Sequence, residues 1–356
     1  MVMYTNQFAR VRWQGVLYDP FLLSNGCKQG AVLSEILYNF YVNGIFEKLR
    51  ERKSGCWIGL HYVGMVGYAD DDWLLAPSLN ALQDMLTTCE EYNNDHGLQF
   101  STDVNPMKSK TKCIAYLRKD RELKQLVLCG NKLPWVTVGK HVGQNITNKA
   151  NGLKKDILIK RAKFIEQNNS LRQEFSFASP ETLIQLNQIF NSDFSGSCVW
   201  DLFCKEQEKL ESSYSTAIRL MLGLPMHTHR FLIEPLSGRI HLKSDMIKRF
   251  LNFLERIRKS EKSTLKYVPS TVSKDVRSVT GRNLVMIKQR CGKGMFEAVS
   301  ARESLKLFKE IPRGEEWKID LAKELIGVRQ ANLSIPGFQA DEVHDILTWI
   351  CTAGPS

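Results

Sequence analysis

Three adjacent aspartates at residues 70–72 constrain the fold of this chain more than any other feature of its sequence. They stand between two short runs of β-forming residues, 61–66 and 73–76, and this spacing predicts a tight hairpin with residues 67–72 as its connection. Neighbouring carboxylates repel one another and cannot neutralise each other. The pattern therefore predicts either an exposed acidic turn or a turn whose charge is balanced by a bound cation.

The composition indicates a globular chain that associates with a polyanion. The 356 residues are 43% hydrophobic and 24% charged, which is enough for a core and suggests about two domains. Forty-nine Lys and Arg against 38 Asp and Glu give a formal net charge of +11. An excess of this kind favours nucleic acid as a partner, with an acidic membrane surface as the second possibility.

The cysteines and the apolar segments give no sign of a metal framework or a membrane anchor. The nine cysteines are scattered and form none of the closely spaced pairs typical of zinc sites, so we expect reduced thiols. Residues 1–13 lack the apolar run of a signal peptide, and no stretch approaches the roughly 20 apolar residues of a spanning helix. We therefore expect no membrane association and a cytoplasmic or nuclear location.

Hydrophobic periodicity predicts an α+β fold in which an antiparallel sheet with helices on one face is followed by an all-helical region. We predict domains at 1–150, 151–268 and 269–356, the last being a helical extension. Further predicted elements are hairpins at 8–23 and 126–138, a strand at 112–117, helices at 31–50 and 79–97 with Ser78 as the cap of the latter, and helices at 182–190, 205–222 and 241–258.

The helical region contains a basic segment at residues 241–266, where eight Lys or Arg accompany three acids. Such a helix can lie along the phosphates of a nucleic-acid duplex. It can equally be a solvated face opposite an apolar stripe that includes Ile247 and Phe250. The sequence leaves both interpretations open.

Several motifs in order resemble the sequence blocks of reverse transcriptases, specifically those of non-LTR (LINE-type) retrotransposons. Residues 67–71 resemble the catalytic hairpin, and residues 25–34, which contain a Gln-Gly pair and open a helix, resemble the block that approaches template and nucleotide. Residues 97–112 resemble the following block with its lysines, and residues 141–143 the turn that grips the primer. The hairpin at 8–23 matches the hairpin that precedes the Gln-Gly block.

This resemblance implies an incomplete polymerase palm at 1–150 and a thumb-like, nucleic-acid-binding region at 151–268. It implies an RNA template, a DNA primer and deoxynucleoside triphosphates as substrates, with Mg²⁺ or Mn²⁺ as cofactor. The implied roles are metal binding and catalysis for Asp70 and Asp71, catalysis for Lys110, nucleotide or template binding for Gln29, Gly30, Tyr68 and Lys108, and primer grip for His141, Val142 and Gly143.

Each of these motifs also has a plainer interpretation. Gly30 can simply open the loop before a helix, where the absence of a side chain otherwise permits a base pair to come close. Lys108 and Lys110 can form a solvated surface rather than act on phosphates as a cation or a general acid. The order of the motifs favours the catalytic interpretation.

The chain departs from the family pattern at its most important point. The family carries a further catalytic aspartate on a strand upstream of the Gln-Gly block, whereas Asp19 is the only acid before Gly30 and lies in a predicted loop. Smaller departures are Ala31, Glu35 and Asp72. We therefore expect a C-terminal fragment with little or no activity alone. A noncatalytic nucleic-acid-binding remnant and a relic without a selected role remain the alternatives.

Overall fold

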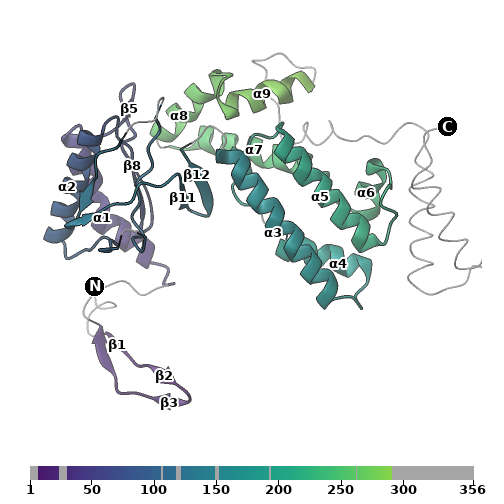
Figure 1. Cartoon of the computed structure of the whole chain (residues 1–356), viewed down its shortest axis with the longest axis horizontal. Coiled ribbons are helices and arrows are strands. Elements are labelled where there is room, and N and C mark those ends of the chain that lie inside the picture. Colours follow the sequence, from purple (N-terminus) through teal and green to yellow (C-terminus); the bar gives the residue numbers. More distant parts are fainter. Residues whose placement is uncertain are drawn as a thin grey trace, which may run out of the picture. The chain divides into compact units, whose positions relative to one another are not determined.

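A computed structural model describes residues 7–23, 30–105, 107–117, 122–148, 152–191, 194–261 and 263–290. Helices and small antiparallel sheets occur together in this part of the chain, in agreement with the predicted α+β class. The chain divides into two compact units (Figure 1). The first unit comprises residues 1–113 and 119–135, and the second comprises residues 114–118 and 136–356.

The first unit contains two helices that the sequence predicted. Helix α1 spans Ser34–Glu51 and buries Val42, Ile45 and Leu49 along one face. Helix α2 spans Leu79–Asp95, and the Ser78 side chain accepts a hydrogen bond from the backbone N–H of Ala81. Because this bond satisfies an otherwise unpaired N–H group, the structure confirms the predicted cap.

The predicted single sheet is wrong for the described residues, where six separate two-stranded antiparallel sheets occur instead. The strands have only two to four residues, so each offers few groups for further pairing. The strands of the first unit are β1 (Gln7–Ala9), β2 (Arg12–Trp13), β3 (Val16–Leu17), β4 (Phe21–Leu23), β5 (Trp57–Ile58), β6 (His61–Tyr62), β7 (Met65–Tyr68), β8 (Asp71–Leu74), β9 (Val127–Leu128) and β10 (Asn131–Lys132).

Two predicted strands of the first unit are broken up. The run 61–66 divides between β6, which pairs with β5, and β7, which pairs with β8. The division falls at Gly64, where an added Cβ would lie 2.6 Å from the ring of Tyr62. The predicted strand 112–117 is reduced to one parallel bridge between Cys113 and Trp135.

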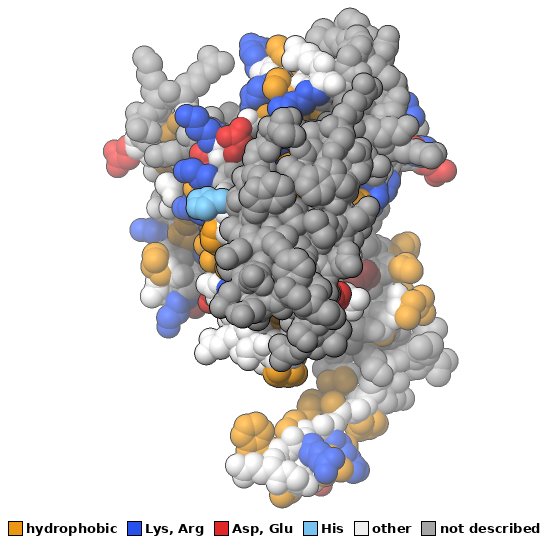
Figure 2. All heavy atoms as spheres, turned by 90° about the vertical axis from the view of Figure 1, so that its right-hand side faces the viewer, with side chains coloured by type: hydrophobic (Ala, Val, Ile, Leu, Met, Phe, Trp, Pro, Cys, Tyr) orange, Lys and Arg blue, Asp and Glu red, His pale blue; other side chains and the backbone are white. Residues whose placement is uncertain are grey.

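The N-terminal hairpin is confirmed, with β1 paired to β4 and β2 paired to β3. Most of its large apolar side chains are exposed, among them Phe8 at 66% and Trp13 at 64%. Figure 2 shows hydrophobic and basic side chains next to one another on this hairpin, at the lower end of the view. Internal packing therefore contributes little to this hairpin.

Two hydrophobic clusters hold the rest of the first unit together. In one, Ile45 and Leu49 of α1 meet Met85 and Cys89 of α2 and Met65 of β7. In the other, Leu86 of α2 packs with Cys113 and with Leu126, Leu128 and Leu133 around the β9–β10 hairpin. Helix α2 therefore packs against the β7–β8 hairpin with Met85 and Cys89, and against the β9–β10 hairpin with Leu86.

The second unit is mainly helical, as the sequence predicted. Figure 1 shows its long helices α3 (Gly152–Glu174) and α5 (Lys205–Leu222) side by side. The remaining elements are β11 (Val138–His141), β12 (Gln144–Thr147), α4 (Pro180–Leu186), η2 (Asn187–Asn191), η3 (Ser197–Val199), α6 (Arg230–Ser237), α7 (Leu242–Lys259), α8 (Ser263–Lys274) and α9 (Val279–Arg290).

The core of the second unit joins elements that are far apart in the chain. Trp200 and Phe164 are fully or almost fully buried together with Phe250 of α7 and Ile287 of α9. The units divide before the β11–β12 hairpin, whereas the sequence placed the change of character near residue 150. Within the described residues, each helix is too short or too polar to cross a membrane. Most of the predicted extension 269–356 lies outside the described residues.

Candidate active site

The acidic segment forms a tighter hairpin than the sequence predicted. Tyr68 pairs with Asp71 and Gly67 pairs with Asp72, so the connection consists of Ala69 and Asp70 alone. Ala69 has a φ of +54°, in the left-handed region that such short connections use. The predicted six-residue connection is therefore wrong, because Asp71 and Asp72 lie on β8.

Gly67 makes room for this arrangement. An added Cβ on Gly67 would lie 2.7 Å from the Oδ1 atom of Asp72 and 2.9 Å from the ring of Phe46. Strand alternation places Asp72 on the same face as Leu74, which packs against the core of the first unit. The third aspartate is therefore turned toward the helices, although its type favours solvent.

Asp72 differs from the other two aspartates in its burial and in the pKa of its carboxyl group. Burial, together with the nearby charges of Asp70 and Asp71, raises the pKa of Asp72 from 3.8 to about 6. Asp70 and Asp71 themselves are exposed. Two accessible carboxylates thus lie beside a third that is partly withdrawn from water.

Tyr38 of α1 is a neighbour of the acidic turn that the sequence analysis missed. Burial raises the pKa of its hydroxyl, and the charges of Asp72 and Asp70 add to this effect. A signal was present in the sequence, because Tyr38 precedes the buried Val42 and Ile45 at helical spacing. The first turns of α1, which follow Gly30, therefore lie on the side of the acidic turn.

Asp70 and Asp71 offer the hard oxygen donors that Mg²⁺ prefers, and a divalent cation would reduce the repulsion among the three aspartates. The described residues contain no group of three or more His, Cys, Asp or Glu side chains arranged to hold a metal ion. The exposed pair therefore supplies two oxygen donors of the kind that Mg²⁺ takes.

Removing the charge of Asp72 is expected to stabilise the protein at neutral pH. A carboxyl group whose pKa is raised in the folded state stabilises that state below its unfolded pKa, and this contribution disappears as the pH rises through about 6. After allowance for solvent screening, Asp72→Asn should add about 1–2 kcal/mol to the unfolding free energy at pH 7. Thermal unfolding of both proteins at several pH values checks this.

The pH series provides the control for this prediction. The difference between wild type and Asp72→Asn should shrink toward zero near pH 4, where the wild-type carboxyl group is protonated in the folded protein. The exposed Asp95, which is not among the charges that act on Asp72, provides the matched variant Asp95→Asn, and this variant should not show the pH-dependent gain. A gain from Asp72→Asn that is equal at pH 4 and pH 7 would contradict the electrostatic explanation.

Tyr68 and Gly30, two further residues of the predicted site, are accessible. Tyr68 is 65% exposed and faces Asp71 across the hairpin. Gly30 has a φ of +78°, a conformation that favours glycine whether or not a base pair approaches it. Gln29 lies outside the described residues.

Lys108 and Lys110 lie in a turn that local hydrogen bonds stabilise. Asn105 accepts one bond from the Met107 N–H and donates its own N–H to the Asp103 carboxylate. Both lysines are exposed, and no ion pair involving either occurs among the described residues. Their charges are available to an anion, and the solvated-surface interpretation also stays open.

The predicted primer-grip turn belongs to the second unit. His141 pairs with Gln144, and the turn consists of Val142 and Gly143 with φ values of +45° and +76°. Positive φ at both central positions is typical of the tightest hairpin turns. Val142 is β-branched and 47% exposed, so its left-handed backbone is strained and its side chain is accessible.

Comparison with known families agrees with the resemblance of the first unit to reverse transcriptases. Residues 2–127 match the family described as reverse transcriptase (RNA-dependent DNA polymerase). The matched region contains Gly30, both helices of the first unit, the acidic turn and both lysines. It ends before His141, so it does not bear on the predicted primer grip. A search of curated proteins found no match.

Proposed function

We propose that residues 2–127 form part of the palm of a LINE-type reverse transcriptase, and that the second unit is its thumb-like region. The observation that carries the proposal is the two-residue turn, which leaves Asp70 and Asp71 accessible within a region similar to reverse transcriptases. The reaction is transfer of a nucleotide to the 3′-hydroxyl of a DNA primer that is paired to an RNA template.

Asp70 and Asp71 would hold Mg²⁺ or Mn²⁺, which when bound activates the attacking hydroxyl group and stabilises the negative charge on the departing pyrophosphate. Gly67 permits the close pairing that orients β8, and Tyr38 lies beside the carboxylates. Lys108 and Lys110 carry exposed charges suited to phosphate oxygens. Gln29 and Gly30 precede α1 and would approach the template and the incoming nucleotide.

Two carboxylates are fewer than the two-metal reaction of this family requires, so we expect little or no polymerase activity from this chain alone. A protein extended upstream to include a strand-borne aspartate is expected to extend a DNA primer on RNA with Mg²⁺. In the extended protein, Asp70→Asn should lower the rate at least about 100-fold because a group that stabilises transition-state charge is lost. Primer-extension assays measure both effects.

Asp95→Asn provides the matched control for this experiment, because Asp95 is an exposed acid of the same unit that pairs with the exposed Lys48. It should leave the rate unchanged. Absence of product from the extended protein with Asp70 intact would overturn the polymerase proposal.

A noncatalytic nucleic-acid-binding role is the second candidate, and the basic residues of α7 favour it. It predicts duplex or RNA binding that weakens steeply with salt and does not respond to Asp70→Asn. Primer extension separates the two candidates, because the noncatalytic role gives no product under any condition.

A further inference from the structure

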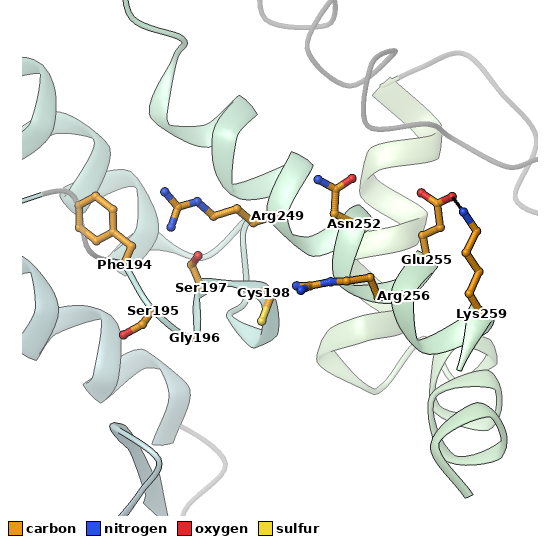
Figure 3. Close-up of a pocket in the computed structure, with 10 residues that line it drawn as sticks. All are labelled: Phe194, Ser195, Gly196, Ser197, Cys198, Arg249, Asn252, Glu255, Arg256 and Lys259. Atoms are coloured by element: carbon orange, nitrogen blue, oxygen red, sulfur yellow. Dashed lines mark ion pairs between the residues drawn. The ribbon is translucent and has the colours of Figure 1, made fainter. Parts of the chain in front are cut away.

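The second unit contains a cavity of about 630 Å³ between α7 and the segment 194–198 (Figure 3). We call it the α7 pocket. From α7 it is lined by Arg249, Asn252, Glu255, Arg256 and Lys259. The inference drawn from this pocket rests on the proposed function.

The charges of the α7 pocket do not cancel. Lys259 pairs with Glu255 at 2.8 Å, and Arg249 uses its Nε atom to bind Asp245 at 2.8 Å. For Arg256, no ion pair is found in the part of the chain that the structure describes. A full positive charge therefore remains in the pocket, together with the Nη groups of Arg249.

Both guanidinium groups point toward the opposite wall. Figure 3 shows Arg249 directed toward Phe194 and Ser197 and Arg256 directed toward Cys198. The pKa of the Cys198 thiol agrees with this orientation. Burial raises that pKa, whereas the nearby positive charges of Arg256 and Arg249 lower it. Both guanidinium groups thus face the 194–198 wall of one pocket, and the paired N–H donors of a guanidinium group match phosphate oxygens.

The opposite wall is fixed by the elements behind it. Gln144 of β12 donates a hydrogen bond from Nε2 to the Ser195 carbonyl at 3.1 Å, and Lys160 of α3 donates to the Ser195 hydroxyl at 3.0 Å. Gly196 has a φ of +82°, and an added Cβ would overlap the side chain of Gln144. The wall is therefore held in place before any ligand binds, which lowers the entropic cost of binding.

The α7 pocket is suited to a phosphate rather than to a base. Its aromatic residue, Phe194, is only 2% exposed and presents no free ring on which a base can stack. Apart from the Glu255 carboxylate, which is paired with Lys259, the accessible polar groups are guanidinium, amide and hydroxyl groups, which bind phosphate oxygens. Gln144, which holds the wall, directly follows the predicted primer-grip turn at 141–143.

We propose that the α7 pocket binds a backbone phosphate of the nucleic-acid strand whose end the turn at 141–143 contacts, with Arg249 and Arg256 as the phosphate ligands. The contact neutralises one phosphodiester without reading sequence. It therefore acts on the position of the strand and on affinity, and it contributes one released counterion to the salt dependence.

Binding of a fluorescent RNA–DNA duplex to the full chain, measured between about 50 and 200 mM salt, tests the proposal. The double variant Arg249→Gln/Arg256→Gln should bind about tenfold more weakly, and the slope of log affinity against log salt should fall by about one. Arg258→Gln is the matched control, because Arg258 lies on the same helix outside the pocket lining. Glu255→Gln should tighten binding, because it releases Lys259.

Alkylation of Cys198, followed by mass spectrometry, locates the ligand and provides a readout that does not depend on the arginine variants. The duplex should slow the alkylation of Cys198. Protection by inorganic phosphate or a deoxynucleoside triphosphate that equals protection by the duplex would make the ligand a free phosphate compound and would overturn the proposal.

The outcomes separate this inference from the proposed function. If the double variant and Arg258→Gln bind the duplex equally, the phosphate pocket is overturned while the polymerase proposal stands on primer extension. If the wild-type chain binds no duplex at any salt concentration, the pocket is overturned and the nucleic-acid role of the second unit with it. Weaker binding by the double variant alone, together with tighter binding by Glu255→Gln, supports the phosphate contact.

Discussion

Glu211→Ala is expected to lower the unfolding free energy of the second unit by about 3–5 kcal/mol, the usual cost of removing one partner from a buried ion pair. Glu211 lies on α5 and is only 3% exposed. Its carboxylate is 2.9 Å from Arg230 and 3.6 Å from the Nζ atom of Lys243. Its loss leaves two positive charges that face each other without an acid between them.

Lys243 accounts for most of this cost. It is only 7% exposed, and its Nζ atom lies 4.9 Å from the ring centroid of Phe203. Arg230 can turn toward water because its side chain is 45% exposed, whereas Lys243 cannot without moving α7. The uncompensated ammonium group therefore remains in a poorly solvated place.

Urea and thermal denaturation measure the effect. Glu211→Ala/Lys243→Met should recover most of the lost stability, because it removes the stranded charge and fills the space with apolar atoms. Asp95→Ala, which breaks the exposed pair with Lys48, is the control and should leave the midpoint unchanged. A Glu211→Ala midpoint equal to that of the control would refute the buried pair.

Lys243 also shows why sequence alone predicts the helices of the second unit but not which of their charged residues are buried. The predicted helix at 205–222 agrees with α5, and the prediction at 241–258 agrees with α7 within one residue at each end, because apolar periodicity is a local property. The same periodicity grouped Lys243 with the basic residues of a solvated or phosphate-binding face. Its burial depends on Glu211 and Phe203, which are remote in sequence and carry no signal at residue 243.

The acidic hairpin shows the same limit on a smaller scale. The presence of a turn and the choice of Asp70 and Asp71 followed from residue types and from the resemblance to reverse transcriptases. The side of the hairpin on which Asp72 lies did not, because aspartates favour turns and the prediction placed all three there. Its position depends on Gly67 and Phe46, which leave a space that only the folded unit defines.

The wall of the α7 pocket at 194–198 could not be predicted from local sequence patterns for a similar reason. Arg249 and Arg256 are seven residues apart and therefore share one face of a helix, which the sequence does reveal. The opposite wall at 194–198 lacks regular periodicity, and it is held by Gln144 and Lys160 from two other elements. Local sequence patterns identify a helix face but do not identify what faces it.

Asp156→Ala is expected to destabilise the second unit by about 3–5 kcal/mol, because the buried Trp200 indole and the partly buried Asn145 amide lose their acceptor. Asp156 lies on α3 and is fully buried. One carboxylate oxygen accepts from the Asn145 side chain at 2.8 Å and the other from the Trp200 indole N–H at 2.9 Å. The residue thus ties the β11–β12 hairpin to the core of the second unit.

The residues at which hydrogen exchange increases distinguish a loosened hairpin from general destabilisation of the unit. Asn145→Ala removes the side-chain bond of the hairpin but keeps the Trp200 bond, so it should increase amide hydrogen exchange mainly at residues 138–147. Asp156→Ala should do the same and also lower the global unfolding midpoint. Equal exchange of this hairpin in wild type and Asp156→Ala would show that the carboxylate does not anchor it.

The same variant also connects stability to nucleic-acid binding. Gln144, the residue before Asn145, holds the wall of the α7 pocket through Ser195, and the turn at 141–143 ends one residue earlier. Loosening the hairpin should therefore weaken duplex binding even in molecules that remain folded, because the pocket then has to be ordered when the ligand binds. Asp156→Ala measured well below its unfolding midpoint should show this loss, and Asn145→Ala should show it with a smaller loss of stability. Duplex affinity that is unchanged in both variants would mean that the hairpin does not order the wall.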